Sequence, residues 1–175
     1  MHVDHNNGTE RNLQVALDAM IAAQSAHNFL GIDEDGQTAI ISTTGNQDGF
    51  LIVRGGRSGP NFSAKHLGDA SQRLSALHLT PRVVIDCSHG NSNKDYKQQA
   101  TVWNDVVSQR LAGNDAIIGL MLESNINPGQ QKPDSDRTKL TYGQSITDAC
   151  IGWEETQELL LGTHAKLAKA FASTA

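Results

Sequence analysis

The sequence predicts an α/β fold with a parallel sheet whose strands are joined by helices. Three apolar runs of strand length are each followed by a segment with apolar residues at helical spacing. This alternation is typical of parallel strands with crossover helices. Polar residues follow each run directly, at the edge where parallel folds bind ligands. The 175 residues, 38% of them apolar, suffice for one core, but a closed eight-stranded barrel needs about 250 residues. The pattern is therefore compatible with two architectures, a small open sheet or half a barrel.

The elements begin with a helix over residues 11–24, where Leu13, Leu17, Met20 and Ile21 share one face. Two short apolar runs, 27–31 and 37–43, flank Asp-Glu-Asp-Gly, which indicates a β-hairpin. The segment before the first helix is short and could form one more strand, which would make about four barrel-type strands.

Three strand–helix units follow the hairpin. A long polar stretch from Ser124 to about Gln144 separates the last strand from the last helix, and a loop of that length is usually functional or mobile. The predicted pairs of strand and helix are 50–54 with 63–77, 82–87 with 94–111, and 115–122 with 153–171. In the helix over 63–77, the apolar face is predicted to consist of Leu67, Ala70, Leu74 and Leu77.

Composition and charge exclude several classes of protein. A net charge of −5 argues against a large nucleic-acid-binding surface. No apolar run approaches the roughly 20 residues of a membrane span, and the polar N-terminus has no signal-peptide core. Cys87 and Cys150 form neither a disulfide framework nor a CxxC motif, and we expect both to be buried packing residues. These features predict a reducing, cytoplasmic setting.

His89, Glu123 and Asp148 are the candidate metal ligands. His89 and Glu123 follow successive predicted strands, and Asp148 precedes the last helix, so we expect the three side chains to converge. One imidazole and two carboxylates suit Mn²⁺, Fe²⁺, Co²⁺ or Zn²⁺. The alternative is that His89 only hydrogen-bonds within its loop and that the acids are solvated. His2 and His5 could mimic a metal pair, but terminal histidines are more often solvated.

Arg54 is the candidate anion-binding residue. It ends a predicted strand and precedes Gly55 and Gly56. Glycine lets a backbone approach a ligand closely, and the guanidinium offers a planar fork to a phosphate or carboxylate. The alternative is a strand-end arginine that pairs with an acid.

A resemblance to a known family is carried by four segments, 51–56, 86–96, 116–124 and 142–154. They closely resemble the type I 3-deoxy-D-arabino-heptulosonate 7-phosphate (DAHP) synthases, and most of all the tyrosine-sensitive members, from about Asn7 to the C-terminus. The resemblance implies a single partial domain, 1–175, that forms the C-terminal half of a (β/α)8 TIM barrel, about strands five to eight, with an inserted β-hairpin. It also implies a transferase that condenses phosphoenolpyruvate with erythrose 4-phosphate, the first step of the shikimate pathway.

The resemblance assigns roles to individual residues. His89, Glu123 and Asp148 match three of the family's four metal ligands, and Arg54 matches an arginine that binds phosphoenolpyruvate. His89 also lies beside the reacting centre in the family, so His89 and Arg54 are the expected catalytic residues. Phe29-Leu30-Gly31 matches a stretch that lines the aromatic amino-acid effector site, where Gly31 would leave room for a phenolic hydroxyl. The alternative is that Gly31 merely shapes the hairpin.

The chain also departs from the family. The family enzymes are about twice as long, and their fourth ligand, a cysteine, lies with most substrate cations on the first four strands. Asn6 stands where the family has a lysine that binds phosphoenolpyruvate. We therefore expect a truncated chain, inactive alone; the alternative is a non-catalytic fragment that binds metal weakly or associates with a partner. We also expect it to oligomerise or aggregate, because a half barrel would leave its edge strands unpaired and would expose whichever of the apolar side chains of Leu51, Val53, Val84 and Leu120 point inward.

Overall fold

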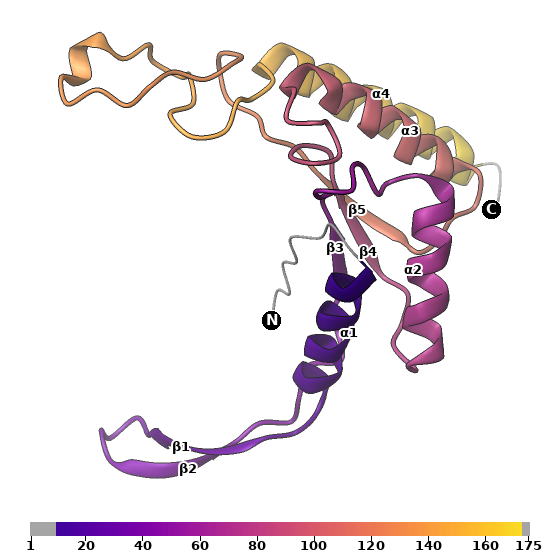
Figure 1. Ribbon diagram of the computed structural model, residues 1–175, viewed down its shortest axis with the longest axis vertical. Helices are drawn as coiled ribbons and strands as arrows, with labels where there is room; N and C mark the ends of the chain where they lie inside the picture. The colour runs from indigo at the N-terminus through magenta and orange to yellow at the C-terminus, as the bar shows by residue number, and fades with distance from the viewer. Residues whose placement is uncertain (1–9, 173–175) are drawn as a thin grey trace.

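A computed structural model describes residues 10–172 of the chain, with the side chains of residues 10–12 left out. Helices and strands alternate around a central sheet, and the β1–β2 hairpin and a long loop extend from it (Figure 1). The fourth strand expected before the first helix, together with Asn6, His2 and His5, lies outside the described residues. The elements are α1 (Glu10–Gln24), β1 (Asn28–Ile32), β2 (Thr38–Ser42), β3 (Leu51–Val53), α2 (Ala64–Ala76), β4 (Val83–Asp86), η1 (Tyr96–Gln98), α3 (Gln99–Leu111), β5 (Ile117–Met121), η2 (Arg137–Lys139) and α4 (Trp153–Ala172).

The predicted parallel sheet is confirmed. Its strands lie in the order β3–β4–β5, and both pairs are parallel, with Val53 opposite Ile85 and Ile85 opposite Leu120. Over residues 10–172 this sheet stays open and does not close into a barrel. The structure therefore establishes a mixed α/β fold, and the half barrel remains a prediction.

The helices bury the sheet's apolar side chains in one core. Leu17 of α1 and Leu67 of α2 belong to the same buried cluster as Leu51 and Val53 of β3. Leu51 and Val53, two of the four residues expected to be exposed if they point inward, instead lie in this core and are only 1% and 6% exposed. Val84 and Leu120 are half-buried. On the predicted face of α2, Leu67, Ala70 and Leu74 are buried as expected.

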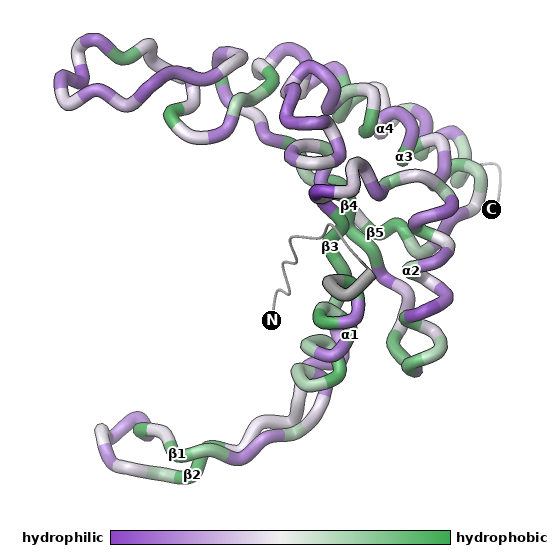
Figure 2. Tube along the Cα trace, viewed as in Figure 1, coloured by the Kyte–Doolittle hydropathy of each residue, from purple (hydrophilic) through white to green (hydrophobic). Residues whose placement is uncertain are grey.

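The predicted hairpin is also confirmed, and it projects away from the core. β1 and β2 pair in antiparallel register, with Leu30 opposite Ile40 and Gly31 opposite Ala39. The Asp33 side chain closes the turn, since its Oδ1 accepts hydrogen bonds from the backbone N–H groups of Asp35 and Gln37. Figures 1 and 2 show that the hairpin extends well beyond α1 and carries hydrophobic residues along its length.

Helix α3 begins later than the periodicity predicts. Asn93 and Lys94 have φ angles of 53° and 62°, in the left-handed region that a right-handed helix cannot contain. Asp95 then caps the short η1 turn, and α3 starts at Gln99. Trp103 of α3 donates a hydrogen bond to Thr163 of α4, and the two helices lie side by side (Figure 1). None of the described helices is long and apolar enough to cross a membrane.

Candidate metal centre at the carboxyl edge of the sheet

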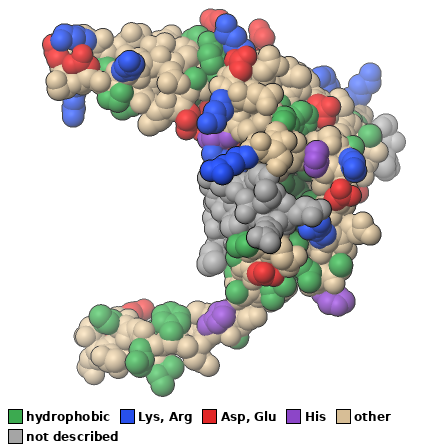
Figure 3. All heavy atoms as spheres, viewed as in Figure 1, with side chains coloured by type: hydrophobic (Ala, Val, Ile, Leu, Met, Phe, Trp, Pro, Cys, Tyr) green, Lys and Arg blue, Asp and Glu red, His purple; other side chains and the backbone are tan. Residues whose placement is uncertain are grey.

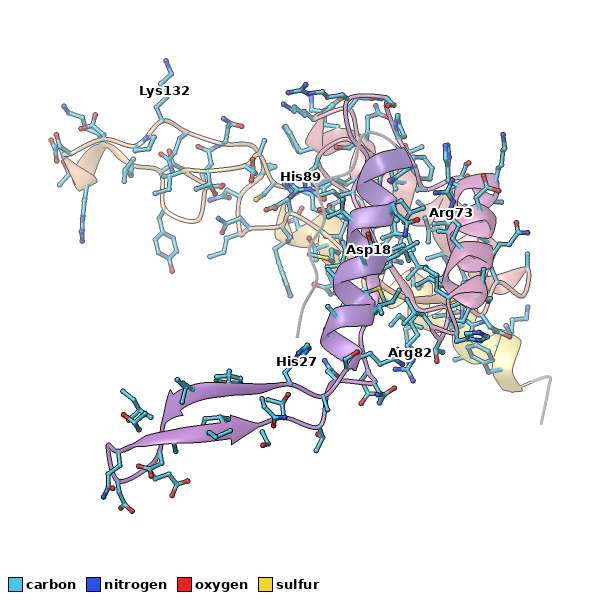
Figure 4. The ribbon with its side chains drawn as sticks, turned by 60° about the horizontal axis from the view of Figure 1, so that its bottom comes forward. Asp18, His27, Arg73, Arg82, His89 and Lys132 are labelled. Atoms are coloured by element: carbon cyan, nitrogen blue, oxygen red, sulfur yellow. The ribbon has the colours of Figure 1, made fainter. Side chains whose placement is uncertain are left out.

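The structure brings His89, Glu123 and Asp148 together. His89 follows β4, Glu123 follows β5, and Asp148 lies on the long loop before α4. The Nε2 atom of His89 lies 3.8 Å from Oε1 of Glu123 and 3.7 Å from Oδ2 of Asp148. One ligand atom from each residue falls within 4.8 Å of the other two. Figure 4 shows His89 where the long loop leaves the body, whereas Lys132 lies farther along that loop.

Asp86, the last residue of β4, orients the His89 ring. Its Oδ2 lies 2.8 Å from Nδ1 of His89, and its Oδ1 accepts the backbone N–H of Ser88. An ionised carboxylate only accepts hydrogen bonds, so Nδ1 is the donor in this contact, and Nε2 is the ring nitrogen that faces the two acids. The His89 backbone has a φ of 50°, an unfavourable conformation that turns the chain sharply after the strand.

Arg54 reaches the same carboxylate from the neighbouring strand. Its Nε lies 3.9 Å from Oδ2 of Asp86, and its side chain is mostly buried. Arg54 therefore lies next to the candidate metal ligands. Its contact with Asp86 also agrees with the alternative interpretation, in which a strand-end arginine pairs with an acid. Asn91 joins the two loops, because its backbone N–H donates to the carbonyl of Arg54 and its amide donates to the carbonyls of Val53 and Asp86.

The glycines after Arg54 allow two backbones to cross. Gly55 has a φ of 67°, and a Cβ there would lie 2.5 Å from the backbone N of Asn91 and still closer to Gly90. A Cβ on Gly90 would likewise lie 2.5 Å from the backbone N of Gly56. We expected these glycines to admit a ligand, but in the structure they admit the neighbouring loop. The crossing is what places Arg54 beside the His89 loop.

Glu123 is held by residues on both sides. The buried side chain of Gln99, the first residue of α3, hydrogen-bonds to both the N–H and the carbonyl of Glu123. The N–H of Ile151 donates to the same carbonyl. Sequence reasoning assigned no role to Gln99, Asp86 or Asn91. One signal was available: Gln99 lies three and four residues before the apolar Val102 and Trp103, so it is a polar residue on the buried face of a helix.

The separations of the two carboxylates from His89 suit a divalent cation. Two ligands on opposite sides of a zinc-like ion lie about 4 Å apart, since each metal–ligand bond is about 2.0–2.2 Å. The separations from His89 Nε2, 3.7 and 3.8 Å, are within that span. A cation would also neutralise the mutual repulsion of the two carboxylates. The cluster thus offers one nitrogen and two oxygens as candidate metal ligands, and metal binding by these residues stays a prediction.

The two cysteines lie close to the cluster in sequence, but both are buried as predicted. Burial, together with the charge of Asp86, raises the pKa of the Cys87 thiol to about 12. Burial also raises the pKa of Cys150, and the Glu123 and Asp148 carboxylates raise it further against a lowering hydrogen bond to Ser145. A raised pKa keeps a thiol protonated near pH 7, and metals bind the thiolate. Burial and the raised pKa values therefore favour packing roles for both cysteines.

The candidate effector residues lie apart from this cluster, on the hairpin. Phe29 is about half exposed. A Cβ on Gly31 would lie 2.6 Å from Cγ1 of Ile41 across the hairpin, so this position favours glycine for local packing. That observation supports the alternative that Gly31 shapes the hairpin.

The comparison with protein families decides the family. The model of the DAHP synthetase I family matches residues 2–161. The chain belongs to this family. The four site residues Arg54, His89, Glu123 and Asp148 all lie within the matched range.

Individual members of the DAHP synthetase I family resemble the chain over nearly its whole length. It is 46% identical over 167 residues to the Tyr-sensitive phospho-2-dehydro-3-deoxyheptonate aldolase of Escherichia coli, covering 95% of the chain and 47% of the relative. It is 46% identical over 164 residues to the phenylalanine-inhibited aldolase of Saccharomyces cerevisiae, covering 90% of the chain and 44% of the relative.

A solved structure of the corresponding Francisella tularensis aldolase superimposes with a TM-score of 0.79 at 45% identity, over 94% of the chain and 46% of that structure. The chain spans about half the length of the relatives it matches. Both the sequence and the fold of the chain therefore agree with the family over that half.

Proposed function

We propose that this chain carries the metal-binding part of the active site of a DAHP synthase, the transferase that condenses phosphoenolpyruvate with erythrose 4-phosphate. The relatives bear the name phospho-2-dehydro-3-deoxyheptonate aldolase. One observation carries the proposal: His89, Glu123 and Asp148 present their ligand atoms within 4.8 Å of one another. Arg54 lies next to this cluster, because Asp86 contacts both Arg54 and His89. In this proposal, β3, β4 and β5 are the last three strands of a barrel, and residues 1–175 form one partial barrel domain.

The residues of the proposed site have three roles: metal binding, phosphate binding and orientation of His89. His89, Glu123 and Asp148 hold a divalent cation of the Mn²⁺, Fe²⁺, Co²⁺ or Zn²⁺ type, which when bound supplies Lewis acidity toward the aldehyde of erythrose 4-phosphate. Arg54 holds the phosphate of phosphoenolpyruvate and aligns it with the second substrate. Asp86 keeps the Nδ1 proton of His89 in place, so that Nε2 remains a ligand atom.

The hairpin is the proposed effector region. Relatives are named for sensitivity to tyrosine or inhibition by phenylalanine, which supports an aromatic amino acid as the effector class. Phe29 offers an exposed ring for such a ligand. Gly31 lies two residues along the same strand, on the same face of the hairpin.

Calorimetric titration with Mn²⁺ tests the proposed metal site. We expect the 175-residue chain to bind Mn²⁺ weakly, because it supplies three protein ligands, and we expect His89→Ala to remove that binding. The matched control is His164→Ala, since His164 is exposed on α4 and far in sequence from the cluster. Unchanged binding in His89→Ala would place the metal elsewhere in the chain.

An activity assay of the same chain separates metal binding from catalysis. We expect no measurable condensation of phosphoenolpyruvate with erythrose 4-phosphate by the 175-residue chain alone, because the family's fourth ligand and most of its substrate cations lie on the first four strands. Turnover by the purified chain that disappears in His89→Ala would contradict this expectation and would show that these residues suffice.

A further inference from the structure

Gln99 makes an unusual contact with the backbone of a proposed metal ligand. Its Oε1 accepts the N–H of Glu123 at 2.8 Å, and its Nε2 donates to the carbonyl of Glu123 at 3.0 Å. The Gln99 side chain is fully buried, with 0% exposed. A single amide thus satisfies both backbone groups of one residue 24 positions away.

The contact begins where the sheet stops supporting the chain. The last described backbone bond from the β4 segment to β5 runs from the N–H of Cys87 to the carbonyl of Met121. Beyond it the β4 segment turns away at His89, and Glu123 lies two residues past the end of β5. The Gln99 amide occupies the place of a neighbouring strand there, because it pairs with both an N–H and a carbonyl.

The same contact reaches the third proposed ligand through Ile151. The carbonyl of Glu123 accepts a second hydrogen bond from the N–H of Ile151 at 2.9 Å, and the carbonyl of Ile151 accepts the N–H of Asn125 at 3.1 Å. Asp148 is only three residues before Ile151. Gln99 therefore fixes the backbone of Glu123, which carries the Glu123 side chain and also binds Ile151 in the loop that contains Asp148.

We propose that Gln99 is a positioning residue of the metal site, which fixes Glu123, and through Ile151 also Asp148, opposite Nε2 of His89. This proposal rests on the proposed metal-binding function, and it identifies Gln99 as a residue that is not a ligand but affects metal affinity. A polar side chain on the buried face of α3 costs free energy unless both of its amide atoms are paired, and both are paired with Glu123. Loss of the amide leaves the Glu123 N–H without this partner and lets the carboxylate move away from His89.

The test compares metal binding by folded variants. Gln99→Leu removes the amide at similar volume, and Gln99→Asn keeps an amide that is one methylene too short to reach. The matched control is Gln109→Leu. Gln109 is another glutamine of α3, and its amide donates to the backbone carbonyl of Phe62, which belongs to none of the segments that carry the proposed ligands. We expect both Gln99 variants to bind Mn²⁺ about 10–100-fold more weakly in calorimetry, as for other groups that orient metal ligands. The control should keep the original affinity.

Two further readouts exclude a purely structural role. Far-ultraviolet circular dichroism establishes that a variant is folded, and the visible absorption spectrum of bound Co²⁺ reports the ligand geometry. We expect folded Gln99 variants with an altered Co²⁺ spectrum. Folded variants with the original Mn²⁺ affinity and Co²⁺ spectrum would overturn the proposal, as would unfolding of both variants, because Gln99 would then serve folding in general. Absence of binding in the original chain, or unchanged binding in His89→Ala, would instead overturn the proposed function.

Discussion

The carboxyl edge of the parallel sheet and the β1–β2 hairpin are built in opposite ways. At the sheet edge, buried polar side chains join residues far apart in the chain: Asn91 donates to Val53 across 38 positions, and Gln99 contacts Glu123 across 24. In the hairpin, pairing is between adjacent strands, and Leu30 and Ile40 are 76% and 73% exposed. Figure 3 shows hydrophobic side chains gathered on the hairpin surface.

This difference separates a pre-organised site from an exposed surface. At the sheet edge, two of the proposed ligands are held by buried partners: Asp86 contacts the His89 ring, and Gln99 pairs with the backbone of Glu123. On the hairpin, Leu30, Ile32 and Ile40 lie on one face and remain exposed. Changes at the edge should therefore disturb both stability and metal binding, whereas changes on the hairpin should affect association and leave the metal site intact.

The largest effect is expected for Gly55→Ala. The new Cβ would collide with the backbone of Gly90 and Asn91 at a φ of 67°. Left-handed backbone costs an L-residue about 1–2 kcal/mol, and overpacking costs about 1–3 kcal/mol, so the free energy of unfolding should fall by roughly 2–5 kcal/mol. Chemical denaturation measures the loss, and Mn²⁺ affinity should fall with it because the His89 loop must shift.

Gly36→Ala is the matched control for that substitution. Gly36 has a φ of 78°, but a Cβ there would meet no atom within 4 Å. It should lose only the conformational part, about 1–2 kcal/mol, and keep its Mn²⁺ affinity. Equal losses in Gly55→Ala and Gly36→Ala would show that the backbone crossing contributes nothing to stability.

An intermediate effect is expected for the double variant Leu30→Ser with Ile40→Ser. These two residues pair directly across the hairpin, and their exposed apolar surface favours self-association. We expect the original chain to form oligomers and the double variant to shift toward monomer at the same concentration. Size-exclusion chromatography with light scattering measures the shift.

The control for association is Leu160→Ser, which removes an exposed apolar side chain from α4. It should leave the oligomers unchanged. If Leu160→Ser and the hairpin variant behave alike, association depends on total apolar exposure and the hairpin has no special part in it.

The smallest effect is expected for Gly31→Ala. The added Cβ would lie 2.6 Å from Cγ1 of Ile41, but that atom belongs to a side chain that can rotate, unlike the backbone beside Gly55. Displacing a side chain from its preferred rotamer costs about 0.5–1.5 kcal/mol. Thermal unfolding should show a small decrease in midpoint, and calorimetry should show unchanged Mn²⁺ binding. A loss as large as that of Gly55→Ala would mean that the hairpin is as tightly constrained as the sheet edge.

The amino-acid sequence by itself determined the order of elements and the identity of the proposed ligands. Alternating apolar runs and helical stripes are local patterns, so they predicted the parallel sheet, the hairpin and the buried face of α2, formed by Leu67, Ala70 and Leu74. His89 and Glu123 could be selected because parallel strands end at one edge, where their side chains do lie together.

Only the tertiary structure decided how those residues are held. The pairing of Gln99 with Glu123, the contact of Asp86 with both Arg54 and His89, and the crossing of Gly55 with Gly90 each join separate segments. The burial of Leu51 and Val53, whose direction in the sheet the sequence left open, likewise depends on α1 and α2 folding over the sheet. Periodicity reports which side of an element is apolar, but the partner of a buried polar group is set by the packing of elements distant in sequence.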